Sequence, residues 1–141
     1  MVRALTAAAF LALVWVGQAA AADLSVEVEG LAGSAGQVLV ALHNNSDSFP
    51  SGWGEAVAVE RVPASAPVVV VRFRNLPPGP YALIAVHDED GDGNMTKTWL
   101  GLPTEGFGTS NNPTFYGPPR YGSARVEVTG DATLVIRIVY F

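Results

Sequence analysis

Three aspartates at alternate positions of a short glycine-rich segment are the strongest chemical signal in this sequence. Asp88, Asp90 and Asp92 are separated by single residues, with glycines at positions 91 and 93. A hard cation such as calcium takes about six to eight oxygen ligands, and a tight loop can point alternate carboxylates at one ion. Counted from Asp88, position seven is Asn94 and position nine is Thr96, which would add a backbone carbonyl and a direct or water-mediated oxygen. The sequence predicts a calcium site at Asp88, Asp90, Asp92, Asn94 and Thr96.

The rest of the segment does not follow the EF-hand pattern. Position twelve is Trp99, where an EF-hand has a bidentate glutamate, and no helical pattern flanks the segment. Glu105, or a carbonyl of the following segment, would have to complete the shell. An exposed turn also selects Asp and Gly, so a solvated acidic turn is a competing interpretation. Against it, neighbouring carboxylates repel each other by about 1 kcal/mol per close pair even in water. Calcium, another metal and a plain turn stay open at this point.

The chain has two histidines, His43 and His87, and each follows an apolar stretch. A transition-metal site would require both imidazoles to converge with a carboxylate, whereas a histidine that ends a strand more often hydrogen-bonds to the next loop. Acid–base catalysis by Asp88 and Glu105, or hydrolysis by His87 with loop carboxylates, is conceivable. No nucleophile or phosphate-loop motif accompanies these residues. We therefore predict no catalytic residue and keep a periplasmic hydrolase as the alternative function.

A long irregular region, rich in Gly, Pro, Asn and Thr, is expected over residues 88–122. Loops of this length in small domains are usually functional or stiffened by a cofactor. Aromatic residues gather here and around residue 53, and they either form a ligand surface or pack as a satellite core that holds the loops. The residues that we predict to contact a ligand are Trp99, Glu105, Phe107, Asn111 and Asn112.

The elements that must position these residues are strands. Of the 141 residues, 49% are hydrophobic, and 15 glycines and 10 prolines suit short strands joined by turns. Residues 24–29 alternate apolar and polar side chains, while residues 37–43 and 81–87 are apolar on both faces, as in a covered sheet. Further strands are expected at 56–62, 68–73, 124–129 and 133–140, the last two forming a hairpin at Gly130-Asp131. The expected fold is a seven-stranded antiparallel β-sandwich of the transthyretin-like, Greek-key kind.

The first 22 residues have the pattern of a cleavable signal peptide. A basic start at Arg3 precedes an apolar run and an alanine-rich end, with cleavage expected before Ala22 or Asp23. An uncleaved anchor helix is the competing interpretation. No second apolar stretch approaches a membrane-spanning length, so residues 23–141 are expected to form one exported domain, periplasmic or secreted, without a transmembrane segment.

Composition excludes several classes of function. The chain has no cysteine, which removes disulfides, thiolate nucleophiles, Cys-ligated zinc and iron–sulfur clusters. Thirteen acidic residues against eight basic ones give a net charge of −5, and Lys97 is the single lysine. Binding to nucleic acid requires a clustered basic patch. We therefore predict no nucleic-acid partner.

Two resemblances to known families follow from ordered motifs. Residues 75–83 (NLPPGPYAL) resemble the turn and strand of transthyretin-like and carboxypeptidase-regulatory-like modules. The chain is also similar to the bacterial domain of unknown function 2141 family at residues 85–93 (AVHDEDGDG), 100–108 (LGLPTEGFG), 110–112 (SNN) and 117–119 (GPP). This resemblance covers nearly all of the chain after residue 22. It implies a small exported bacterial β-sandwich with no established activity and no catalytic residue to carry over.

The chain departs from this family pattern at two places. Family members tend to have an acidic residue shortly after the glycine-rich turn, where this chain has residues 95–98 (MTKT). The family also usually has an aromatic residue at the position of His43. The first departure weakens a complete calcium shell, and the second makes a two-histidine site peculiar to this protein.

The leading hypothesis is a non-catalytic exported module, stabilised by calcium, that presents residues 99–121 to an envelope protein, peptide or carbohydrate. The alternatives are the hydrolase and a structural protein that assembles through open sheet edges.

Overall fold

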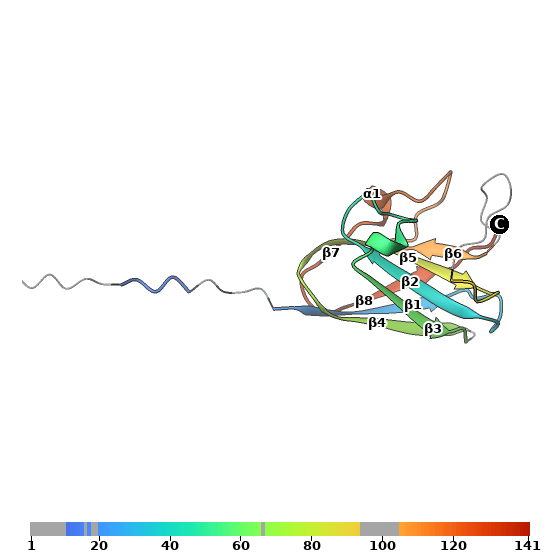
Figure 1. The fold of residues 1–141 in the computed structure, drawn as a ribbon, viewed down its shortest axis with the longest axis horizontal. Coiled ribbons are helices and arrows are strands. Elements are labelled where there is room, and N and C mark those ends of the chain that lie inside the picture. Colours follow the sequence, from blue (N-terminus) through green and yellow to red (C-terminus); the bar gives the residue numbers. More distant parts are fainter. Residues whose placement is uncertain (1–10, 16, 18–19, 66, 94–104) are drawn as a thin grey trace, which may run out of the picture.

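The computed structural model describes residues 11–15, 17, 20–65, 67–93 and 105–141. Strands dominate this part of the chain, and helix is limited to a 3-10 turn at Trp53–Glu55 and a short helix α1 at Tyr121–Ala124. The strands are β1 (Ala22–Glu29), β2 (Gln37–His43), β3 (Ala58–Pro63), β4 (Val68–Leu76), β5 (Gly79–Asp88), β6 (Phe107–Thr109), β7 (Val126–Val128) and β8 (Ala132–Arg137). The all-β fold class is confirmed (Figure 1).

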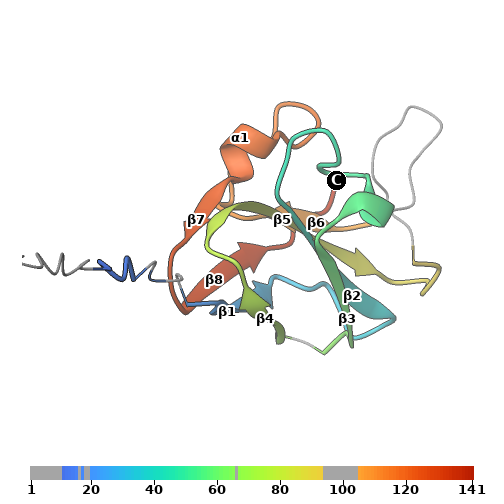
Figure 2. The ribbon, with the colours of Figure 1, turned by 60° about the vertical axis from the view of Figure 1, so that its left-hand side comes forward.

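The strands form two sheets that face each other (Figure 2). One has three strands in the order β4-β1-β8, and the other has the order β3-β2-β5-β6 with β7 also paired to β5. Alternation along β1 and β4 sends every second side chain into the space between the sheets. There Leu24, Val26, Val71 and Phe73 pack against Val40 and Leu83 of the larger sheet. This is the main hydrophobic core.

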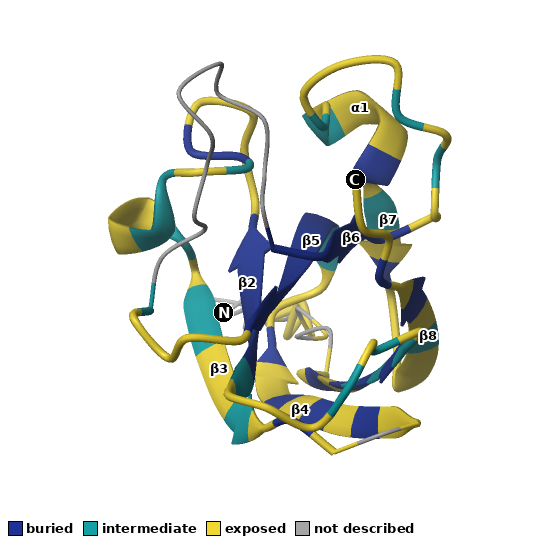
Figure 3. Ribbon diagram, turned by 90° about the vertical axis from the view of Figure 1, so that its right-hand side faces the viewer, coloured by how far each residue is buried: buried dark blue, intermediate teal, exposed yellow. Residues whose placement is uncertain are grey.

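The larger sheet is covered on both faces, which explains why β2 and β5 are apolar on both sides. Its second face carries a smaller core that includes Ala41, Ile84 and Val86. The loop before the 3-10 turn covers this face with Phe49, and helix α1 covers it with Ala124. Figure 3 shows β2 and β5 buried along most of their length, between the smaller sheet and this outer layer.

Three details of the expected topology were wrong. The described residues contain eight strands, not seven, because the short β6 lies within the region expected to be irregular. The sandwich is not fully antiparallel, since β1 and β8 pair in parallel, with Val26 opposite Leu134. The Gly130-Asp131 turn does not close a hairpin, because β7 pairs with β5 whereas β8 pairs with β1. The turn instead carries the chain from the larger sheet to the smaller one.

The first strand begins at the boundary expected for signal-peptide cleavage. Ala22 is fully buried and pairs with Leu76 of β4. The backbone N–H of Asp23 donates to Asp131 at 2.8 Å, and its carboxylate accepts from the N–H of Asn75 at 3.0 Å. Cleavage itself stays a prediction. No helix in the described residues is long and apolar enough to cross a membrane.

Candidate metal site at the end of strand β5

Four carboxylates from two separate segments meet at the end of β5. Asp88 is the last residue of that strand, Asp90 and Asp92 lie in the turn that follows, and Glu105 lies just before β6. One oxygen from each of the four can be chosen so that all lie within 4.8 Å of one another. Asp88 and Glu105 are buried, whereas Asp90 and Asp92 are exposed. The cluster therefore has a buried side and an open side.

Asp88 is the anchor of the cluster, because its carboxylate accepts hydrogen bonds from three directions. The donors are Nε2 of Gln37 at 2.7 Å, the backbone N–H of Gly93 at 2.8 Å and that of Asp92 at 3.2 Å. Burial raises the pKa of Asp88, but the hydrogen bonds outweigh burial and hold the pKa below its usual value. The group is therefore kept ionised in a buried position.

The pKa of Asp90 is shifted in the opposite direction, above its usual value. The N–H of Asp92 donates to Asp90 at 3.1 Å, which by itself lowers the pKa of Asp90. A hydrogen bond shared with Asp88, burial and the negative charges of Asp92 and Asp88 together raise that pKa above its usual value. A cation bound beside Asp90 would favour its ionised form and so act against this shift.

The backbone of the turn requires glycine at two positions. Gly91 and Gly93 have φ of 72° and 79°, in the left-handed region that other residues rarely adopt. This conformation turns the chain back so that the N–H groups of residues 92 and 93 reach the Asp88 carboxylate. The same glycines therefore shape the loop and direct the aspartates to one place.

The sequence-based metal set is only partly located in the structure. Asp88, Asp90 and Asp92 lie together as expected, while Asn94 and Thr96 lie outside the described residues. Glu105, named from the sequence as a candidate to complete the shell, is the fourth carboxylate of the cluster. All donors are hard oxygen atoms, which suits calcium or magnesium better than a soft transition metal.

The two histidines do not converge. In the antiparallel pairing of β2 and β5, His43 lies opposite Ala82 and His87 lies opposite Val38. Five residues separate these pairs, which corresponds to roughly 16 Å along the strands. Side-chain alternation also puts His43 on the face of Ala41 and His87 on that of Ala85, which belong to different cores. A site that uses both imidazoles is excluded by this placement.

His87 is fully engaged within the main fold. Its Nε2–H donates to the carbonyl of Ala35 at 2.8 Å, and its Nδ1 lies 2.7 Å from the hydroxyl of Tyr140. That hydroxyl also accepts from the N–H of Ala32 at 2.9 Å. Oε1 of Glu89 lies 3.7 Å from Nδ1. Because both ring nitrogens have partners and the residue is 1% exposed, the hydrolase alternative gains no support here.

His43 bonds to the loop that follows its strand, as expected for a histidine at a strand end, but its complete burial was not predicted. The ring is fully buried, its Nδ1 lies 2.8 Å from Oγ of Ser48, and Phe49 packs edge-on against it. Its Nε2 has no hydrogen-bond partner among the described residues. Burial lowers the pKa of His43, and the negative charge of Glu55 only partly opposes this effect. The one sequence signal was a polar residue at the end of an otherwise apolar strand.

The residues predicted to contact a ligand have different surroundings. Trp99 lies outside the described residues. Phe107 is 3% exposed and packs between Phe115 and Phe141, with ring centroids 4.9 and 5.6 Å away. Its ring is thus covered by other aromatic rings of the chain. Ligand binding through these residues stays a prediction.

Residues 110–112 use their side chains to join separate segments. Oγ of Ser110 accepts from the N–H of Leu83 at 3.0 Å and donates to the carbonyl of Ala124. The Asn111 amide donates to the carbonyls of residues 123 and 125. The Asn112 amide donates to the carbonyl of Val135 at 2.8 Å and accepts from the N–H of Arg137 at 2.8 Å. The side chain of Asn112 therefore pairs with the edge of β8 as a backbone peptide would.

Comparison with models of known protein families identifies the family of this chain. A family model described as "Uncharacterized protein conserved in bacteria (DUF2141)" matches residues 26–136. The chain belongs to the DUF2141 family. The match runs from β1 to β8 and therefore includes the carboxylate cluster, the 110–112 segment and both sheets.

Other comparisons add no further identification to this DUF2141 chain. No curated protein and no solved structure matches it. The resemblance to transthyretin-like modules stays a prediction, and the family brings no assigned activity to the carboxylate cluster.

Proposed function

We propose that this DUF2141 protein is an exported, non-catalytic β-sandwich that binds one calcium ion at Asp88, Asp90, Asp92 and Glu105. The observation that carries the proposal is the convergence of these four carboxylates from both sides of residues 94–104. The ion would stabilise the sandwich and fix the ends of that segment, and the region that follows would be presented to a partner in the cell envelope.

The charge distribution supports cation binding. Hydrogen bonds hold the pKa of the buried Asp88 below its usual value, while a hydrogen bond with Asp88, burial and the charges of Asp92 and Asp88 raise the pKa of Asp90. Like charges at about 4 Å repel by about 1 kcal/mol in water and by more where the solvent is partly excluded. A divalent cation would convert this repulsion into attraction. Binding of the ion would therefore raise the free energy of unfolding.

The ligand chemistry supports calcium in particular. Calcium takes about six to eight oxygens, from carboxylates, carbonyls and water, in flexible geometry, whereas magnesium requires a near-ideal octahedron and keeps most of its waters. The exposed side of the cluster leaves room for water, and Asn94 and Thr96 remain proposed as additional ligands. Export and the signal peptide are proposed from the sequence pattern of residues 1–22 alone.

The test is calorimetric titration of the purified protein with calcium and with magnesium, combined with thermal melts in calcium and in chelator. We expect one bound calcium ion and a higher melting temperature. The variants Asp90→Asn and Glu105→Gln should weaken binding by at least about tenfold, which is about 1.4 kcal/mol. Each has a matched control away from the cluster, Asp47→Asn and Glu60→Gln, which should bind as the wild type does. Identical melting curves in calcium and in chelator, with no heat of binding, would show that the cluster is an acidic turn that binds no calcium.

A further inference from the structure

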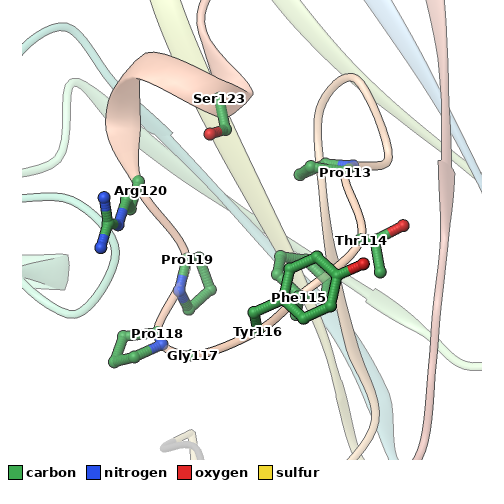
Figure 4. A pocket seen from close by; sticks show the side chains of 9 residues that line it. All are labelled: Pro113, Thr114, Phe115, Tyr116, Gly117, Pro118, Pro119, Arg120 and Ser123. Atoms are coloured by element: carbon green, nitrogen blue, oxygen red, sulfur yellow. The ribbon is translucent and has the colours of Figure 1, made fainter.

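The outer layer over the larger sheet consists of two segments that are attached to the fold in different ways. One is the β2–β3 loop, residues 44–57, and the other is residues 113–124, which end in α1. The second segment curves around a hollow (Figure 4). It is anchored by several hydrogen bonds, because the side chains of Ser110 and Asn111 donate to the carbonyls of residues 123–125. The β2–β3 loop has no comparable set of anchors among the described residues.

The β2–β3 loop is attached to the sheet mainly through His43. The hydrogen bonds of the loop are largely internal, such as the bond of 3.1 Å from the N–H of Ser48 to Oδ1 of Asn45. At its far end, the N–H of Val57 donates to the backbone of β2 at 2.8 Å. Between its ends, in the part of the chain that the structure describes, one hydrogen bond joins the loop to the sheet. This bond links Oγ of Ser48 to Nδ1 of His43 at 2.8 Å.

The closed loop leaves no place for a second proton on His43. The ring is fully buried, and Phe49 of the loop packs edge-on against it with ring centroids 5.5 Å apart. Nε2 has no hydrogen-bond partner among the described residues. Whichever nitrogen carries the hydrogen of the neutral ring, protonation puts a hydrogen on both nitrogens. The charged ring would then have an unpaired N–H in an apolar core, which is costly. The closed loop therefore disfavours the imidazolium.

The charges around His43 do not compensate for its burial. Burial lowers the pKa of His43, and the negative charge of Glu55, in the same loop, raises it by a smaller amount. The other titratable groups on the loop and on the nearby parts of β3, β5 and α1 are Asp47, Glu60, Arg61, Tyr81 and Tyr121. The hydroxyl of Tyr81 donates to the carbonyl of Pro77, and its ring belongs to the main core. Glu55 is thus the charged group that acts on His43.

We propose that the β2–β3 loop is an acid-sensitive lid, which lies closed over the larger sheet while His43 is neutral and opens when the imidazole is protonated. Opening separates Ser48 and Phe49 from His43, brings the charged ring into water and uncovers the second core. The main core between the sheets stays intact, because none of its buried residues belongs to the loop. The carboxylate cluster lies at the opposite end of β2, beside Gln37, so the lid does not require the cation.

The chain has no cysteine, so a single thiol can report on either face of β5. Ala82 and Ala85 are both fully buried, but Ala82 lies opposite His43 in the second core, whereas Ala85 belongs to the main core. The variants Ala82→Cys and Ala85→Cys should react with a dipyridyl disulfide only when the face that carries the thiol is uncovered. Each rate is divided by the rate of the same variant unfolded in urea at the same pH, which removes the titration of the thiol itself.

Between pH 7.5 and 5.5 the relative rate of Ala82→Cys should rise roughly five- to tenfold, because one proton binds to the open form with the usual histidine pKa and to the closed form only at lower pH. Ala85→Cys should stay protected over the same range. Equal rises at the two positions would indicate opening of the whole sandwich and would overturn the proposal, as would a constant rate at position 82.

Substitutions in the Ala82→Cys background identify the group that titrates. His43→Phe should abolish the rise, whereas Asp47→Asn, which removes another titratable group of the loop, should keep it. A rise that persists in His43→Phe would overturn the proposal. Ser48→Ala provides a second test, because it removes the hydrogen bond that joins the loop to His43. It should speed labelling at pH 7.5 and keep the dependence on pH, and a rate equal to that of Ala82→Cys alone would contradict the lid. Thermal melts at pH 7.5 verify that each variant is folded.

Discussion

The side-chain amide of Gln37 donates to Oδ2 of Asp88 at 2.7 Å and so joins the first residue of β2 to the last residue of β5. The same two residues are partners in the antiparallel register of these strands. The anchor of the acidic turn is therefore fixed by the central strand pair of the larger sheet. The position of the cluster depends on this pair as much as on the turn itself.

Replacing Gln37 by Leu should destabilise the protein. A hydrogen bond to a buried carboxylate contributes about 1.5–3 kcal/mol, and its loss also removes a donor that keeps the pKa of Asp88 low. Urea unfolding at pH 7 in chelator should show a loss of that size. Calcium should restore part of it if the ion neutralises Asp88. Glu60→Gln, on the exposed side of β3, is the control, and a loss of equal size there would contradict the assignment.

The burial of His43 predicts a pH-dependent stability. The pKa of this group is lowered in the folded protein from its usual 6.5, so the unfolded chain binds the proton more readily. Stability should therefore be complete above pH 6.5 and should fall as the pH drops from 6.5 toward the folded-state pKa. Thermal melts between pH 7.5 and 5 measure this dependence. The variant His43→Phe should fall less steeply with pH, and an unchanged slope would show that other groups cause the loss.

The amide of Asn112 should contribute to stability through β8. The residue has φ of 45°, so Asn112→Gly keeps the backbone conformation accessible and removes only the side chain. Two hydrogen bonds to the β8 backbone are lost, and we expect a decrease of about 1–3 kcal/mol in the free energy of unfolding. Hydrogen exchange should locate the effect at the N–H of Arg137. Unchanged protection there would contradict this role.

Gly108 should tolerate no side chain. A Cβ at this position would collide with the backbone carbonyl of Arg137, whereas one at Gly117 would meet nothing within 4 Å. Gly108→Ala should therefore lower the free energy of unfolding by several kcal/mol, while Gly117→Ala should leave it nearly unchanged. Denaturant unfolding of the two variants gives the comparison. Similar stability of both would show that β6 and β8 are not as closely packed as described.

Local patterns predicted the strands and the acidic cluster well, because their signals lie in neighbouring residues. The alternation in residues 24–29 and the doubly apolar stretches predicted strands. The spacing of Asp88, Asp90 and Asp92 predicted that their carboxylates lie together. Pairing between strands depends on the whole chain, so the parallel contact of β1 and β8 was missed. The burial of His43 was missed for a similar reason, since the residues that cover it follow in a separate loop.

The role of residues 110–112 could not be predicted from neighbouring residues either. Small polar side chains in a loop usually face solvent or a ligand. Here they form hydrogen bonds with backbone groups of three segments that are distant in sequence. Such bonds become visible only when the strands that need them have been placed. The motif is thus explained at least in part by the architecture.

The position of β1 between β4 and β8 also governs the order in which the protein can fold. The first strand lies beside the last, and the link between Asp23 and Asp131 spans 108 positions of the chain. Contacts so distant in sequence slow folding, because a long chain must close before they form. As the chain emerges from the ribosome, β1 can pair with β4 early, but its other edge stays open until β8 has been made. Premature termination before residue 132 would leave that edge free to pair with another chain.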